Sequence, residues 1–195
     1  MRIGRRPIER PDTRRCAGPS LPALVRKRKA GPVNGSPPLL VFTLDAQRYA
    51  LRLEAVERVV SAAEITPLPG APEVVLGLIN LRGRVVPVIQ LRRRFSLPDR
   101  DIRLSDSFIV ASTSRLSFAL VADAVHGLVE CPPEAVVPAE EILPRMDPIE
   151  GVMVLPDGMV LISDLDRALS LEEEASLRDR LATLGLGQES GGGGG

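Results

Sequence analysis

Residues 74–91 read VVLGLINLRGRVVPVIQL and carry the strongest structural signal in the chain. Two apolar runs, 74–81 and 84–91, are separated only by Arg82 and Gly83. A two-residue connection with glycine at a position that favours positive φ is typical of a β-hairpin. The stretch therefore predicts two antiparallel strands joined by a tight turn.

Similar short apolar segments lie on both sides of this hairpin. Pro87 cannot donate a hydrogen bond to a neighbouring strand, so we expect its strand at a sheet edge or at a bulge. Residues 54–60 fit either one or two helical turns or a turn into an edge strand. The other expected strands are 39–44, 49–53, 107–112, 116–121, 125–129, 136–138, 149–155 and 159–162.

The spacing of these segments decides the fold class. No helical crossover lies between them, which favours antiparallel β-barrels or a sandwich over a parallel sheet. The single convincing helix comes last, where Ser170 and Glu173 form a capping-box pattern and Gly185 is a suitable terminator. Its expected apolar stripe is Leu171, Ala175, Leu177, Leu181 and Leu184. The sequence predicts an all-β fold with a C-terminal helix.

Charge divides the 195 residues into unlike parts. Lys and Arg number 25 and so do Asp and Glu, but residues 1–37 hold ten cations and two acids, a charge of +8, which leaves −8 for the rest. Residues 1–37 are also rich in proline and lack apolar periodicity, so we expect a disordered basic leader. We expect one folded domain over 38–184 and a flexible, Gly-rich tail over 185–195.

Catalytic and ligand-binding patterns are nearly absent. His126, the single histidine, has no serine or cysteine nucleophile in a motif around it, and a structural role explains it better. Asp164 and Asp166 fit a helix cap and first turn. No glycine loop has phosphate-binding spacing, and no cluster suits a metal. We expect no enzyme activity, no cofactor and no metal.

The cysteines and the lengths of the apolar runs indicate the cellular compartment of the protein. Cys16 and Cys131 are far apart, so a disulfide framework has no support. Apolar runs stay under ten residues, whereas a membrane-spanning helix needs about twenty. The sequence predicts a cytoplasmic protein without a membrane span or export signal.

The turn of the central hairpin is a candidate contact site. Arg82 beside Gly83 presents a planar guanidinium with several donors on a rigid support, as in an interface hot spot. Many surface hairpins, however, end in Arg-Gly without any such role. From these residues alone both interpretations stay open.

The sequence resembles the CheW chemotaxis adaptor family. The matching residues are 41–44, 49–51, 56–60, the Pro-rich loop 65–69 with 71–73, 77–83 with 86–88 and Leu91, 121–123 with Val125, Gly151, 157–158 and 161–169. The resemblance covers about residues 38–184 and implies two intertwined five-stranded SH3-like β-barrels. It also implies a non-enzymatic scaffold that couples a chemoreceptor's cytoplasmic tip to a CheA-type histidine kinase, with other CheW-like domains in array rings.

The resemblance also implies a set of contact residues. Receptor binding in this family uses an apolar groove between the barrels, and Val56, Val59, Gly77, Asn80 and Arg82 match positions that contact receptor or kinase. Two further positions depart from the family's usual acids.

The departures are Arg58 on the expected strand after Val56, which we count among the partner-binding residues, and Gln90 after Val88. A changed charge at a rim alters partner selection through repulsion as much as attraction. We therefore expect both residues to affect the choice of partner.

Three functions are consistent with the sequence. The first is a receptor–kinase coupling protein recruited to membrane receptor arrays. The second is an adaptor of a motility or developmental pathway, which the departures favour. The third is a nucleic-acid or anionic-membrane binder that acts through the basic leader, although a leader without aromatics offers no base stacking.

Overall fold

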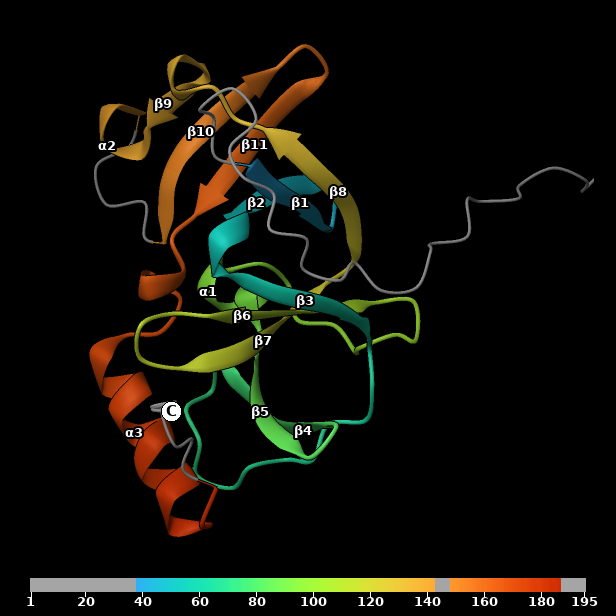
Figure 1. The fold of residues 1–195 in the computed structure, drawn as a ribbon, viewed down its shortest axis with the longest axis vertical. Helices are drawn as coiled ribbons and strands as arrows, with labels where there is room; N and C mark the ends of the chain where they lie inside the picture. Colours follow the sequence, from blue (N-terminus) through green and yellow to red (C-terminus); the bar gives the residue numbers. More distant parts are fainter. Residues whose placement is uncertain (1–37, 143–147, 187–195) are drawn as a thin grey trace, which may run out of the picture.

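The computed structural model describes residues 38–142 and 148–186, which form two β-sheets and a C-terminal helix (Figure 1). The six-stranded sheet has the order β8-β1-β2-β11-β10-β9. Its strands are β1 (Pro38–Leu44), β2 (Gln47–Arg52), β8 (Ala124–Glu130), β9 (Val136–Pro138), β10 (Ile149–Leu155) and β11 (Gly158–Ser163).

The five-stranded sheet has the order β3-β6-β7-β5-β4. Its strands are β3 (Val56–Ser61), β4 (Val75–Leu81), β5 (Arg84–Ile89), β6 (Ser107–Ser112) and β7 (Ser117–Ala122). The chain enters the six-stranded sheet, builds the whole five-stranded sheet and then returns, so the two halves are intertwined. The short β9 gives the first sheet a sixth strand.

Most strand pairs are antiparallel, as the sequence predicts. Two pairs, β2 with β11 and β5 with β7, are parallel. Neither needs a helical crossover, because the connection between the paired strands runs through other strands.

The expected edge position of Pro87 is wrong, because β5 lies between β4 and β7. Its parallel pairing with β7 involves only Val88 and Ile89, so the proline precedes that ladder and removes no bond from it. The nearby register shift is in β4, between Val75 and Gly77.

Short helical segments connect the strands. Residues 53–55 form a single turn, η1 (Leu53–Ala55), before the edge strand β3. Of the two expectations for residues 54–60, the turn into an edge strand is therefore confirmed. The others are α1 (Leu91–Arg94), η2 (Pro133–Ala135), α2 (Ala139–Ile142) and η3 (Leu165–Arg167). Asp164 caps η3 by accepting a hydrogen bond from the Asp166 amide.

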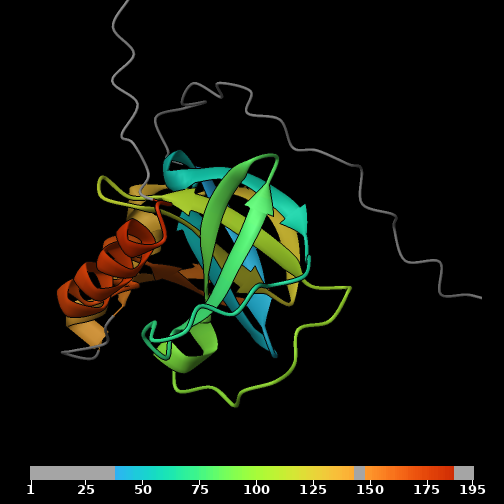
Figure 2. The same ribbon diagram turned by 90° about the horizontal axis from the view of Figure 1, so that it is seen from below.

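The final helix, α3 (Leu171–Thr183), has the expected capping box between Ser170 and Glu173. It ends at Gly185, whose φ is 67° and whose amide donates to the Ala182 carbonyl. Seen from below, the helix lies to one side of the strands (Figure 2).

The expected apolar stripe of α3 is partly wrong. Leu177 and Leu181 are buried, but Leu171, Ala175 and Leu184 are exposed and Glu174 is buried instead. Glu174 lies between the guanidinium groups of Arg115 and Arg178, whose positive charges offset the free-energy cost of burying its carboxylate.

Three apolar clusters hold the fold together. The largest unites both sheets and α3, with Phe42 and Tyr49 from one sheet and Ile109 and Phe118 from the other. Each sheet also has a smaller cluster on its other face, around Met153 and around Phe108. The two halves are therefore joined by a shared core.

Candidate interaction surface

The hairpin turn predicted from the sequence joins β4 to β5 through Arg82 and Gly83. Both residues have positive φ, 57° and 89°, as the two central positions of a type I′ turn require. The Asn80 side-chain oxygen accepts a hydrogen bond from the Gly83 amide at 2.7 Å and braces the turn. Arg82 is exposed, and among the described residues its side chain has no hydrogen bond or ion pair.

Gly77 lies in β4 where another segment passes against it. Thr66 and Leu78 form a β-bridge through two backbone hydrogen bonds of 2.8 Å. A Cβ on Gly77 would stand 2.2 Å from the Thr66 carbonyl oxygen. The close approach explains the glycine by packing, and its role in partner contact stays a prediction.

The remaining predicted site residues lie on β3, at the opposite edge of the five-stranded sheet from β4. Val56 is buried in the core, whereas Arg58 and Val59 are half-buried. The pairing with β6 shifts register between Val56 and Arg58, so Glu57 sits at a β-bulge. A bulge redirects the side chain of the extra residue.

The redirected Glu57 connects β3 to the hairpin turn. Its carboxylate accepts a hydrogen bond from Arg84 at 2.8 Å and another from the Ser117 hydroxyl at 3.1 Å. Arg84 directly follows the turn residues, so the ion pair brings the bulge of β3 toward Arg82. We call Arg58, Val59, Asn80 and Arg82, with the Glu57–Arg84 pair, the turn–bulge surface. Val56 is only 5% exposed and belongs to the core, so it is not part of this surface.

Electrostatics keep this pair charged. Burial alone would raise the pKa of Glu57, but the hydrogen bond and positive charge of Arg84 outweigh it and hold that pKa below its ordinary value. Sequence reasoning missed the pair, because its partners are 27 residues apart and no spacing rule connects them.

Gln90 corrects one expectation about the rim. Its side chain is only 3% exposed, so it is not a surface position that can select a partner by charge. Its side-chain oxygen is buried and has no hydrogen-bond partner in the described part of the chain. The change from the family's usual acid to Gln90 therefore alters the interior of the fold and not the surface that faces a partner.

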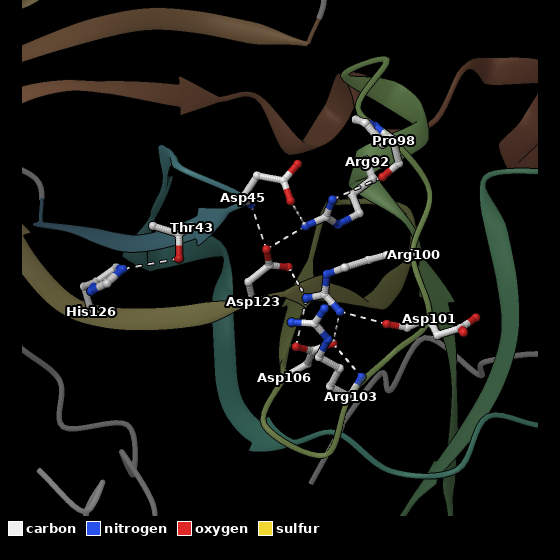
Figure 3. A network of polar contacts seen from close by, with 10 residues as sticks. All are labelled: Thr43, Asp45, Arg92, Pro98, Arg100, Asp101, Arg103, Asp106, Asp123 and His126. Carbon is white, nitrogen blue, oxygen red and sulfur yellow. Dashed lines mark hydrogen bonds and ion pairs between the residues drawn. The ribbon is translucent and has the colours of Figure 1, made fainter. Parts of the chain in front are cut away.

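A second polar cluster lies where the two sheets meet (Figure 3). Arg92, which is 1% exposed, donates to Asp45 at 2.8 Å and to Asp123 at 2.6 Å. Asp45 belongs to the β1–β2 turn, and Asp123 stands between β7 and β8. Arg92 in α1 therefore ties the two halves of the molecule together.

Arg100 extends the cluster into the loop before β6. It donates to both carboxylate oxygens of Asp106 at 2.8 and 2.9 Å and also to Asp123. Burial alone would raise the pKa of Asp123, but hydrogen bonds from Arg92, the Asp45 amide and Arg100 hold it below its ordinary value. The cluster pairs two guanidinium groups with three carboxylates and links the loop before β6 to the junction of the two sheets.

His126 lies outside this cluster. It is exposed, and its Nε2 lies 3.3 Å from the Thr43 hydroxyl, which agrees with the structural role expected from the sequence.

Two cavities lie elsewhere in the described part of the chain. One, of about 430 Å³, is lined by residues that include Ile65, Gln90 and Arg100; another, of about 660 Å³, lies around Arg93 and Arg94. Neither includes a residue of the turn–bulge surface. Within residues 38–142 and 148–186, no group of three or more acids, cysteines or histidines could hold a metal, and no helix is long and apolar enough to span a membrane.

Comparison with known proteins gives consistent matches. The family model described as "CheW-like domain" matches residues 38–173. "Chemotaxis protein CheW" of Rhizobium meliloti (strain 1021) is 28% identical over 142 residues, 72% of this chain and 92% of that protein. "Protein FrzA" of Myxococcus xanthus is 32% identical over 97 residues, 50% of this chain and 61% of that protein.

A solved structure matches as well. The crystal structure of the scaffolding protein TtCheW from Thermoanaerobacter tengcongensis is 30% identical, with a TM-score of 0.62 over 67% of this chain and 90% of that one. The likeness confirms the expected fold of two SH3-like β-barrels with a C-terminal helix, although hydrogen bonding leaves β8 and β9 as edges of the six-stranded sheet.

Proposed function

Because the chain belongs to the family of CheW-like domains, and is thus a non-enzymatic chemotaxis scaffold, we propose that it couples a chemoreceptor's cytoplasmic tip to a CheA-type histidine kinase. It works in the cytoplasm, recruited to membrane receptor arrays. A scaffold changes kinase activity only by contacting the kinase's states differently, so its function depends on contact surfaces.

One observation supports the turn–bulge surface as a contact site. Arg82 is exposed, rests on a turn braced by Asn80, and has no partner among the described residues. A guanidinium held in place on a rigid turn loses little conformational freedom on binding. The half-buried Arg58 and Val59 on the nearby strand β3 supply further contact area.

The test is a reconstitution with the cognate receptor fragment and kinase. Replacing a hot-spot residue costs 2 kcal/mol or more in binding free energy, so Arg82→Ala should weaken complex formation by about 30-fold and reduce receptor-dependent kinase activation. Arg103→Ala is the matched control, because Arg103 is also exposed but lies on the loop before β6. Equal binding by both variants would contradict the assignment of this surface.

The pathway is the second open question. The match to Protein FrzA, whose name carries no chemotaxis label, is the observation that keeps an adaptor role in another pathway as the alternative. Kinase activation measured with receptors and kinases from each candidate pathway separates the two. A role for the leader in binding nucleic acid or membranes concerns residues outside the described part of the chain and stays a prediction.

A further inference from the structure

One end of the six-stranded sheet gathers exposed glutamates. Strand register places the start of β1, the ends of β2 and β8 and the start of β10 at this end, since Pro38 pairs with Glu130 and Leu39 with Arg52. The Arg52 guanidinium hydrogen-bonds to Glu150 across it. We call the exposed residues Glu54, Glu130, Glu140, Glu141 and Glu150 the acidic rim.

The acidic rim has few cations of its own. Described residues 124–142 and 148–155 contain neither lysine nor arginine, and Arg52 is already paired. Beside the rim, β9 forms the outermost strand of the sheet and α2 follows it (Figure 1). Val137 on β9 and Ile142 on α2 leave 37% and 44% of their surfaces exposed. The surface therefore combines an apolar patch with negative charge.

The same chain carries a segment of matching chemistry. Residues 21–29 read LPALVRKRK, three large apolar residues followed by four consecutive cations. Eight residues, 30–37, lie between Lys29 and Pro38, where the chain enters β1 beside the acidic rim, so nine residue-to-residue steps join the two. Nine such steps reach at most about 30 Å, whereas the four strand spacings from β1 to β9 amount to about 19 Å. Chain length therefore allows contact.

We propose that residues 21–29 dock on the acidic rim of the same chain, with their cations on the glutamates and their apolar residues on Val137 and Ile142. Tethering favours this occupant, because a short connection holds a segment at an effective concentration of order mM. Exposed ion pairs are individually weak and screened by salt, so the segment forms a reversible cover over this face. The net charges of +8 and −8 are thus partly neutralised within one molecule.

A spin label on Cys16 tests the proposal in the full-length chain. Cys131 is 4% exposed, so a nitroxide reagent labels Cys16, and mass spectrometry verifies a single adduct. Paramagnetic broadening should weaken the amide signals of β9 and α2 more than those of 103–105, on the loop before β6. About 1 M NaCl, where the Debye length falls to about 3 Å, should restore the signals.

Charge reversal supplies the matched comparison. Replacing all four cations of 26–29 by glutamate should abolish the selective broadening, whereas the same change at Arg2, Arg5, Arg6 and Arg10 should leave it in place. Broadening that survives the first change, or that both changes remove equally, overturns the proposal. A mixture of spin-labelled chains and isotope-labelled chains that carry no spin label tests whether the occupant comes from a second copy. Broadening in that mixture also overturns the proposal, because the label and the observed amides are then on different chains.

Discussion

Replacing Arg82 by asparagine is expected to stabilise the fold while weakening partner binding. Arg82 has a φ of 57° in a type I′ turn, a conformation that favours Asn-Gly. The left-handed region costs most L-residues about 1–2 kcal/mol, and asparagine tolerates it better. If asparagine recovers about half of that cost, the free energy of unfolding rises by about 0.5–1 kcal/mol. A chain of this size would then melt about 1–4 °C higher.

Calorimetric melting and titration against the cognate kinase or receptor fragment measure the two effects separately. Binding should fall by about 30-fold, as expected for loss of a hot-spot side chain. Gly83→Ala is the control: its φ is 89° and an added Cβ meets no atom within 4 Å, so only backbone strain acts and stability should fall by about 1 kcal/mol. A lower melting temperature for Arg82→Asn would refute the strain argument, and unchanged binding would refute the contact role.

Two further predictions concern the scaffold beneath the surface. Gly77→Ala would force a Cβ to within 2.2 Å of the Thr66 carbonyl, so the hairpin must shift and urea unfolding should show a loss of about 3 kcal/mol or more. Asp123→Asn removes a charge that faces the buried Arg92 and should cost about 3 kcal/mol at pH 7. The pKa values of Asp123 and Glu57 are lowered in the fold, so their stabilisation is present above the unfolded values near 4 and disappears as pH falls through the folded values. Between about pH 5 and pH 2, the free energy of unfolding should therefore fall less for Asp123→Asn than for the unaltered chain. Equal falls would contradict the lowered pKa of Asp123.

Local signals in the sequence predict the elements that depend on a few adjacent residues. The Arg82–Gly83 connection predicts the β4–β5 hairpin, and the Ser170–Glu173 pair predicts the start of α3. Both succeed because the controlling interactions, positive φ in a turn and a reciprocal cap, lie within four residues. The fold class follows from repetition of such short-range signals.

Features that depend on distant partners could not be predicted in this way. The Glu57–Arg84 pair spans 27 residues and the Arg92–Asp123 pair spans 31, and no periodicity relates their positions. Burial of Glu174 in place of Leu171 depends on where Arg115 arrives from another hairpin. The β3 bulge that turns Glu57 toward Arg84 has no glycine or proline to mark it in the sequence.

Among the described residues, three non-glycine residues have positive φ, and their surroundings differ in a way that bears on function. Asp45 donates its amide to Asp123 and accepts from Arg92, so two internal contacts offset its strain. Ser96 ends α1, where its amide donates to the Arg93 carbonyl in the usual left-handed helix cap.

Arg82 is the third, and its side chain has no such compensation within the described chain. The turn itself requires positive φ but does not require arginine, since asparagine or glycine would fill the position at lower energy. Strain that persists without an internal partner is typical of residues whose interaction lies outside the molecule. The proposed contact role therefore rests on the identity of residue 82 rather than on the shape of its turn.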